Sequence, residues 1–333
     1  MERTRYKINI PPTGSKYIPS RLHYDDEIGV VKNQLGDKGS FKEFGQPTAI
    51  LCSDFHLRED TPTCWTGDFQ TEQWTAVNFI ASLQRKYDCK VIHAGDLFHH
   101  WKPSPLLLSL AIRLLPNKFY TIYGQHDLPQ HSWELRNKSG IATLIEADKI
   151  KLLLGGIGVN YGQEPPKEKD TIRMFSNRDI LVWHHLTYLS KPFPGAEGGM
   201  AEGILRKYPQ FDLIVTGDNH QSFTVEYQGR RLVNPGNLTR QVADQADFQP
   251  RVALWYAADN SIQWVNLPIQ EGVISREHIE VKAERDARID AFISRLDGDY
   301  KAEMSFEENL ESFFKINDIR DSVKQIIYKA IDS

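Results

Sequence analysis

Four short motifs in the sequence place aspartate, histidine or both directly after an apolar run. They are Ser53-Asp54-Phe55-His56, Gly95-Asp96-Leu97-Phe98-His99, Gly124-Gln125-His126-Asp127 and Gly217-Asp218-Asn219-His220. A fifth apolar run, residues 180–183, ends in His184-His185. Carboxylate and imidazole ligands together favour manganese, iron or zinc over magnesium alone. Each aspartate taken singly could be a turn former, but five motifs in order predict one pocket with the chemistry of a two-metal hydrolase.

The apolar runs before these motifs are expected to be strands that carry the polar side chains to one place. They cover residues 49–52, 91–94, 119–123, 180–183 and 213–216. The spacing of apolar residues predicts helices over 71–87 and 105–115. Strands alternating with helices indicate a layered α/β domain. The carboxyl ends of strands in such a domain are where ligands bind, because a rigid sheet fixes their spacing.

The chain is expected to fall into three segments. Residues 1–47 are polar, with scattered proline and glycine, and predict an N-terminal extension; residues 48–270 form the main domain. Near its end, residues 252–256 and 262–267 predict a hairpin turning at Asp259-Asn260. Residues 271–333 predict a helical tail, with a helical stripe of Ala287, Phe292, Ile293 and Leu296 and a capping box at Ser305 and Glu308. Residues 190–200 are a loop, either a substrate lid or a flexible connection.

Composition sets broad limits on the function. The chain has 333 residues, 40% of them hydrophobic and 25% charged, with a net charge of −4, so no overall basic excess indicates a nucleic-acid partner. Three widely spaced cysteines fit neither a disulfide framework nor a zinc site, which predicts a reducing, cytoplasmic compartment. We expect no membrane association, because no apolar run resembles a signal peptide or a membrane span. Any use of ATP would need a partner, because the chain has no P-loop motif.

The order of the motifs resembles that of the calcineurin-like metallophosphoesterases over about residues 48–238. That pattern reads D-x-H, G-D, G-N-H-D, a strand-end histidine and G-H-x-H. More narrowly, residues 95–104 are similar to the G-D-L-F-H-x-x-K-P-S string of SbcD-type double-strand-break repair nuclease subunits, and Asn234-Pro235-Gly236 is similar to their N-P-G-S. The resemblance implies an α/β fold in which a two-sheet sandwich is flanked by helices, with a C-terminal β-hairpin and helical tail.

The resemblance also implies two divalent metal ions, manganese first, with magnesium, iron or zinc as alternatives. The first ion would be held by Asp54, His56, Asp96 and His220, with Asp96 bridging to the second. The second ion would be held by Gln125, His184 and Asp218. His184 is preferred to His185 because neighbours on a strand point to opposite faces, and His93, inside a strand, is expected to be structural.

Three further roles come from the same resemblance. His126 would assist phosphate or leaving-group chemistry, Asp127 would orient His126, and His99 would position the DNA backbone.

Lys102, Lys191 and Arg240 are candidate phosphate contacts, with solvated surface charge as the alternative.

The sequence departs from the family pattern at two positions, both of them at the second metal. Gln125 replaces asparagine and adds a methylene, and Asp218 replaces histidine with a harder, anionic ligand. The two changes either compensate for each other, with an altered metal preference, or weaken the binding of the second ion. We favour compensation, because every other ligand position is filled.

These inferences predict a hydrolase that uses two metal ions to activate water. Its expected activity is metal-dependent cleavage of DNA, as an exonuclease or endonuclease in repair, recombination or replication. The alternatives are a phosphoesterase acting on a small nucleotide or a phosphoprotein, and a non-catalytic scaffold subunit. The resemblance implies three partners, which are DNA, an SbcC-type ATPase and a second copy of the chain joined through helices near the first two motifs. The helices of residues 305–331 would bind the ATPase or pack as a cap on the core.

Overall fold

The computed structural model describes residues 45–154, 157–167, 175–191, 197–277, 279, 284–291 and 306–331. Internal contacts divide the chain into two compact units, Met1–Ile274 and Ser275–Ser333, which are considered separately. Most of the expected N-terminal extension and the centre of the 190–200 loop lie outside the described residues. The expected three-segment division stays a prediction.

The first sheet of unit 1 contains six strands in the order β13-β12-β1-β2-β3-β4. Their bounds are β1 Ala49–Cys52, β2 Lys90–His93, β3 Phe119–Thr121, β4 Lys151–Leu152, β12 Arg251–Tyr256 and β13 Ser261–Asn266. Strands β1 to β4 run parallel, and the antiparallel β12–β13 hairpin joins the sheet beside β1. The carboxyl ends of β1, β2 and β3 therefore meet at one edge.

The second sheet contains five strands in the order β10-β11-β9-β6-β5. Their bounds are β5 Gly158–Val159, β6 Ile180–Trp183, β9 Leu213–Thr216, β10 Phe223–Tyr227 and β11 Arg230–Asn234. Strands β5, β6, β9 and β11 run parallel, and β10 is antiparallel to β11. A small pair, β7 Thr187–Tyr188 and β8 Gly199–Met200, follows β6.

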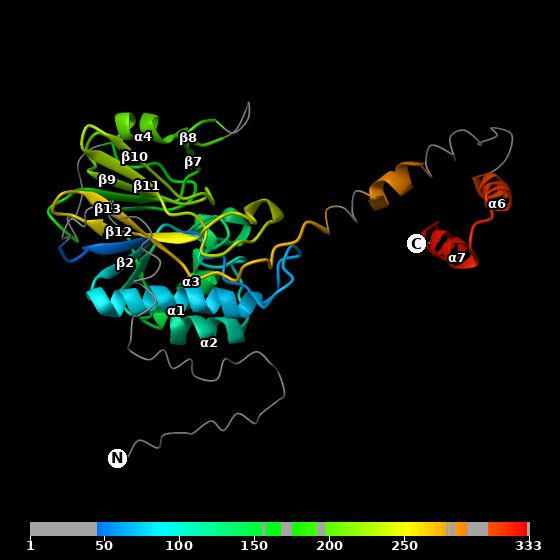
Figure 1. The fold of residues 1–333 in the computed structure, drawn as a ribbon, viewed down its shortest axis with the longest axis horizontal. Helices are drawn as coiled ribbons and strands as arrows, with labels where there is room; N and C mark the ends of the chain where they lie inside the picture. Colours follow the sequence, from blue (N-terminus) through cyan, green and yellow to red (C-terminus); the bar gives the residue numbers. More distant parts are fainter. Residues whose placement is uncertain are drawn as a thin grey trace, which may run out of the picture. The chain divides into compact units, whose positions relative to one another are not determined.

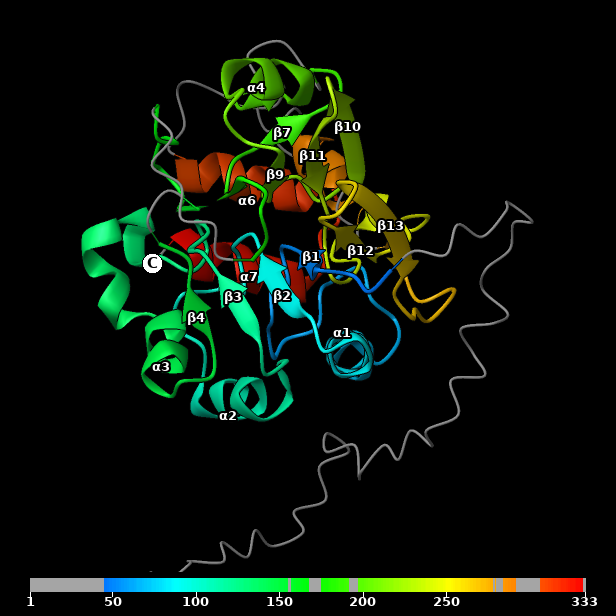
Figure 2. The same cartoon turned by 90° about the vertical axis from the view of Figure 1, so that its left-hand side faces the viewer.

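Helices cover both outer faces of the paired sheets, as Figures 1 and 2 show. On one side lie α1 Phe69–Tyr87, α2 Pro105–Leu114 and α3 Gly140–Glu146, and on the other lies α4 Ala201–Lys207. Short 3-10 turns are η2 Pro129–His131, η3 Trp133–Lys138 and η4 Ala243–Gln245. The Ser104 hydroxyl accepts the Leu107 N–H, and Pro105 follows, so the K-P-S part of the specific string is the start of α2.

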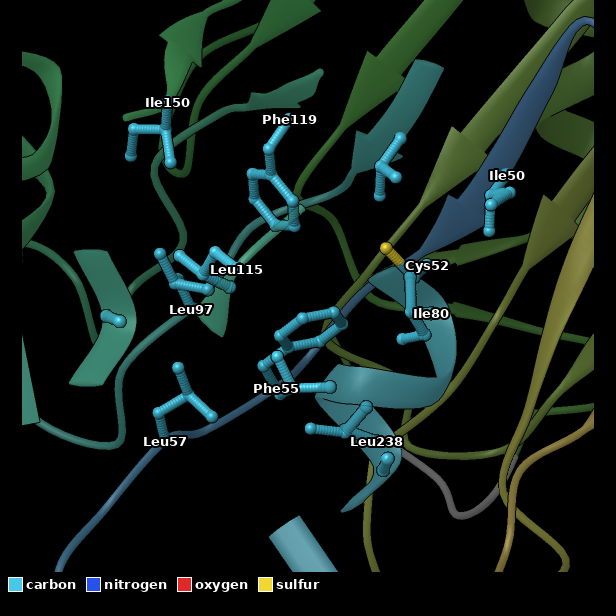
Figure 3. Close-up of a cluster of buried hydrophobic side chains, with 14 of the residues drawn as sticks. Ile50, Cys52, Phe55, Leu57, Ile80, Leu97, Leu115, Phe119, Ile150 and Leu238 are labelled. Carbon is cyan, nitrogen blue, oxygen red and sulfur yellow. The ribbon is translucent and has the colours of Figure 1, made fainter. Parts of the chain in front are cut away.

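Alternate residues of β1 face different cores, which explains why the strand is apolar throughout. Ile50 and Cys52 pack against α1 in the first cluster of Figure 3. Ala49 and Leu51 instead face a second cluster that joins the two sheets through residues such as Val182. A third cluster lies between the second sheet and α4. The α/β/β/α sandwich expected from the sequence is confirmed.

Unit 2 contains a helical hairpin formed by α6 Phe306–Ile316 and α7 Asp321–Ile331, after a helical stretch at residues 284–291. Its core consists of Leu310, Phe313 and Phe314, packed by Ile319, Ile327 and Tyr328. Phe292, Ile293, Leu296 and Ser305, singled out in the sequence, lie outside the described residues. Of the helices in the described part of the chain, none has the length and apolar character needed to span a membrane.

Candidate metal centre

The loops that follow β1 and β2 are hydrogen-bonded to each other beyond the ends of the strands. The Asp54 N–H donates to the Gly95 carbonyl at 3.0 Å, and the His56 N–H donates to the Asp96 carbonyl at 3.0 Å. Phe55, between the two polar residues, is buried in the first core cluster (Figure 3). The apolar residues inside the motifs therefore anchor the loops, and the polar residues are left for the pocket.

Asp54 and Asp96 each use one carboxylate oxygen to bind a loop from elsewhere in the chain. Asp54 Oδ1 accepts the Asp218 N–H at 3.0 Å, and Asp96 Oδ1 accepts the His126 N–H at 2.9 Å. The other oxygen, Oδ2, is buried in both residues and has no hydrogen-bond partner among the described residues. Four loops from both sheets are thus tied together around two carboxylate oxygens that remain available.

The backbone at these residues takes an unusual conformation. Positive φ values occur at Asp54 (50°), His56 (44°), Asp96 (57°) and Asp218 (74°). Such conformations persist only where the surroundings enforce them, and they cluster at functional sites. A Cβ on Gly124 would lie 2.1 Å from Asp96 Oδ1, so only glycine lets the third loop approach the carboxylate.

His184 points into this cluster and His185 does not. His184 Nδ1 donates to the Ala94 carbonyl at 2.7 Å, and Nε2 lies 3.4 Å from Asp96 Oδ2. His185 instead stacks on Trp183, with ring centroids 3.9 Å apart. The hydrogen bond at Nδ1 fixes the ring so that Nε2 is the atom presented to the pocket.

Three more imidazoles surround His56. The ring centroids of His126, His220 and His99 lie 4.8, 5.3 and 5.8 Å from that of His56. His126 Nδ1 donates to the His99 carbonyl at 2.9 Å, which leaves Nε2 of His126 free of that contact. His93 lies apart from this group, buried and 2.9 Å from the Thr121 hydroxyl, as expected of a structural histidine.

The structure brings five of the seven expected ligands into groups that could hold a metal. Within the described residues these groups are Asp54-His56-His220, Asp54-Asp96-His184 and His56-His99-His126, each with ligand atoms within 4.8 Å of one another. The remaining two expected ligands contact each other, since Gln125 Nε2 donates to Asp218 Oδ1 at 2.9 Å. Their assignment as ligands stays a prediction.

The electrostatics of the pocket suit a divalent cation. Burial, with the Asp96 charge adding to it, raises the pKa of Asp54 to about 8. Burial lowers the pKa of His56 well below its usual range and that of His99 to about 4, so both imidazoles are neutral, as metal ligation requires. Burial alone would lower the pKa of His184, but Asp96 and Asp54 raise it to about 10, so an ion bound at this imidazole would have to displace its proton. Buried carboxylates beside unpaired imidazole nitrogens are a donor set that a divalent ion would neutralise.

Asp127 contacts the loops around His126 and not the imidazole itself, and its expected role of orienting His126 stays a prediction. Its carboxylate accepts the N–H groups of Leu97 at 3.2 Å, Phe98 at 3.1 Å and Gly124 at 3.0 Å. The carboxylate therefore joins the second and third loops through their backbones. Gly124 lies in the loop that carries His126, whereas the imidazole of His126 itself donates to the His99 carbonyl.

Asn234 supports the site in a way that the sequence analysis missed. Its amide nitrogen donates to the Asn219 carbonyl at 2.5 Å and the Gln221 carbonyl at 2.7 Å, and its oxygen accepts the Thr216 hydroxyl at 3.0 Å. These bonds hold both sides of His220. The Asn-Pro-Gly string was the available signal, although it can also be read as a simple turn.

The three candidate phosphate contacts have different environments. Arg240 is only 3% exposed and lies 3.6 Å from the buried carboxylate of Glu72, so it is neither a phosphate contact nor a surface charge. Its guanidinium also donates to the backbone, including the Ala246 carbonyl at 3.3 Å. Lys102 and Lys191 are exposed. No sequence signal pairs Arg240 with Glu72, because the two residues are far apart in the chain.

The sequence matches a family model and a curated relative. A family model described as calcineurin-like phosphoesterase matches residues 48–222, more than half of the chain. The DNA double-strand break repair protein Mre11 of Haloferax volcanii is 30% identical over 172 residues, which are 47% of this chain and 38% of that protein. The chain therefore matches well under half of that relative's length.

Solved structures give weaker matches. An archaeal phosphodiesterase is 14% identical, with a TM-score of 0.36, over 66% of this chain and 99% of its own. A metallophosphoesterase from Sphaerobacter thermophilus is also 14% identical, with a TM-score of 0.33, over 67% of this chain and 89% of its own.

Proposed function

Because the chain belongs to the calcineurin-like phosphoesterase family, we propose that it is a metal-dependent phosphodiesterase that hydrolyses DNA. The observation that carries the proposal is the buried set of carboxylate and imidazole atoms at the carboxyl ends of strands from both sheets. Two features support DNA as the substrate: the G-D-L-F-H-x-x-K-P-S string at residues 95–104 and the similarity to a relative named for DNA double-strand break repair.

The proposed ligands divide into two sets that share Asp96. The first set is Asp54, His56, Asp96 and His220, and the second is Asp96, Gln125, His184 and Asp218. Two divalent ions, manganese first, would when bound withdraw charge from the phosphate and acidify a water molecule. The hydrogen bonds at Asp54 Oδ1, Asp96 Oδ1 and His184 Nδ1 orient the remaining donor atoms before any ion arrives.

His126 is proposed to handle the leaving oxygen of the phosphodiester. Because its Nδ1 donates to the His99 carbonyl, Nε2 is the atom that would give or take a proton. His99 lies beside it, with ring centroids 5.5 Å apart, in position to contact the DNA backbone. Asp127 supports both residues through its bonds to the two loops.

Two protein partners belong to the proposal. A second copy of the chain would pack on α2, which leaves Leu106 62% and Ile112 41% exposed. An SbcC-type ATPase would bind the hairpin of α6 and α7, whose exposed apolar side chains are Phe306, Ile316, Val323 and Ile326. Both surfaces expose large apolar side chains that a protein interface would bury.

The test incubates the purified chain with end-labelled linear DNA and Mn²⁺, beside an Asp96→Ala protein prepared identically. We expect metal-dependent cleavage by the wild type and none by the variant. Equal cleavage by both proteins would overturn the proposal. Hydrolysis of bis(p-nitrophenyl) phosphate without cleavage of DNA would indicate the small-molecule alternative, and loss of both reactions would favour a scaffold.

A further inference from the structure

The two residues at which the chain departs from the family pattern are hydrogen-bonded to each other. Gln125 follows β3 in the first sheet, and Asp218 follows β9 in the second, yet Gln125 Nε2 lies 2.9 Å from Asp218 Oδ1. We propose that these residues form one matched unit that makes the second metal position richer in oxygen ligands than the family pattern and shifts its preference from Zn²⁺ towards Mn²⁺ relative to that pattern. The inference rests on the proposed function and specifies the ions that its site would take.

The hydrogen bond determines which atoms the two side chains can offer. The carboxylate of Asp218 only accepts, so the amide of Gln125 must turn its NH₂ group towards it. The reverse orientation would place two acceptor oxygens against each other. Gln125 Oε1 and Asp218 Oδ2 are therefore left to bind an ion, and each residue sets the orientation of the other.

The backbones of both residues are also held in place. The Asp218 N–H donates to Asp54 Oδ1 at 3.0 Å, and Asp218 has a φ of 74°. The Gln125 carbonyl accepts His131 Nδ1 at 3.1 Å and the Leu128 N–H at 3.3 Å. The pair is thus a fixed bridge between the edges of the two sheets, and not a chance contact of two mobile side chains.

The changes in side-chain length offset each other. Glutamine reaches further than asparagine by one methylene, and aspartate is shorter than histidine. An ion between the two loops would therefore shift towards the second sheet, where Asp218 and His184 are attached. Either change made alone would leave one ligand too long or too short, which is why we treat Gln125 and Asp218 as one unit.

The two metal positions consequently differ in ligand chemistry. The first set offers two carboxylates, Asp54 and Asp96, and two imidazoles, His56 and His220. The second offers oxygen from Asp96, Gln125 and Asp218, with His184 as its imidazole. Carboxylate and amide oxygens suit Mn²⁺ and Mg²⁺, whereas more imidazole suits Zn²⁺. The affinity for Zn²⁺ relative to Mn²⁺ should therefore be lower at the second position than at the first.

The experiment compares metal binding by the full-length protein with binding by Gln125→Asn, Asp218→His and the double variant. Metal-stripped proteins are titrated with Mn²⁺ by calorimetry and by electron paramagnetic resonance, then challenged with Zn²⁺. We expect two Mn²⁺ per chain in the wild type and a loss of about 10–100-fold in second-site affinity in each single variant. The double variant should recover most of the binding and should bind Zn²⁺ at that site more tightly, relative to Mn²⁺, than the wild type does.

Two controls keep the result interpretable. Asp247→His makes the same charge change at an exposed residue and should bind like the wild type. Asp218→Asn keeps the size of the side chain but removes its charge, so it should lose the second Mn²⁺ even if the histidine variant fails to fold. Circular dichroism establishes the fold of each variant.

Several results would overturn the inference. One is a wild-type protein that binds only one Mn²⁺ per chain. Another is a double variant whose loss of second-site affinity equals the product of the losses in the two single variants. The third is a double variant whose preference between Mn²⁺ and Zn²⁺ at the second site is the same as in the wild type. Two bound Mn²⁺ with the expected coupling but no cleavage of DNA would support the inference and overturn the proposed function. The two proposals therefore fail separately.

Discussion

At the scale of single residues, Asp54 and Asp96 show how the fold orients the carboxylates of the candidate metal centre. Each uses Oδ1 to accept a backbone N–H from another loop and keeps Oδ2 buried and free of hydrogen bonds among the described residues. Both residues also have a positive φ, a conformation that costs about 1–3 kcal/mol per residue. These local costs are offset by core residues within the motifs, such as Phe55, and a bound cation would stabilise the buried carboxylate oxygens.

Replacing His126 tests its role in the reaction separately from metal binding. A His126→Gln variant loses the ionisable ring but keeps its backbone N–H, which bonds Asp96 Oδ1. We expect the rate of phosphodiester cleavage to fall by about 10²–10⁴-fold, with Mn²⁺ affinity unchanged by calorimetry. His100→Gln, at an exposed neighbouring histidine, is the control and should cleave normally. Normal cleavage by the His126 variant would exclude a role in proton transfer.

The sequence predicted the types of residue in the pocket but not the bonds between them. Aspartate and histidine after apolar runs indicated a metal site because those side chains share a ligand chemistry. The function of each carboxylate oxygen depends on which backbone N–H comes within 3 Å, and that is set by tertiary structure. For the same reason, the bonds of Asp127 to three N–H groups and the burial of Arg240 beside Glu72 could not be foreseen.

At the scale of elements, the buried strands were easier to predict than the strands that support them. Strands β1, β6 and β9 lie at the expected residues because they are apolar on both faces. Strands β10 and β11 were missed, since they contain charged and polar residues and are only partly buried. The missed strand β11 ends at Asn234, which holds the loop of His220, so a functional contact was missed with it.

The exposed apolar residues of α2 give a test at the element scale. Glutamate at both Leu106 and Ile112 should abolish self-association, because two charges would be buried in an apolar contact. Analytical ultracentrifugation should show a dimer for the wild type and a monomer for the double variant, with similar circular dichroism. Leu154→Glu, at another exposed leucine, should leave the dimer intact. A wild type that sediments as a monomer would contradict the proposed dimer.

At the scale of the whole molecule, the α/β/β/α layering of unit 1 follows from which faces of each strand are apolar. Strands β1 and β9 are apolar on both faces and are covered on both sides, so two sheets and two helical layers are needed. This arrangement brings the carboxyl ends of strands from both sheets together at one cluster of potential metal ligands. The placement of β6 and β9 against β1 and β2 depends on contacts between residues far apart in the chain. The sequence indicated this placement only through the family resemblance.

Because the proposed ligands come from both sheets, metal binding should stabilise unit 1 as a whole. An ion at 100 times its dissociation constant adds about 2.7 kcal/mol to the free energy of unfolding, which corresponds to about 5–10 °C in a domain of this size. Calorimetry of metal-stripped protein should show this rise in Tm on adding Mn²⁺. Asp96→Asn, which keeps an oxygen for the His126 N–H but loses the charge, should show little rise. An equal rise in both proteins would place the stabilising ion elsewhere, because Asp96 is the residue that both ligand sets share.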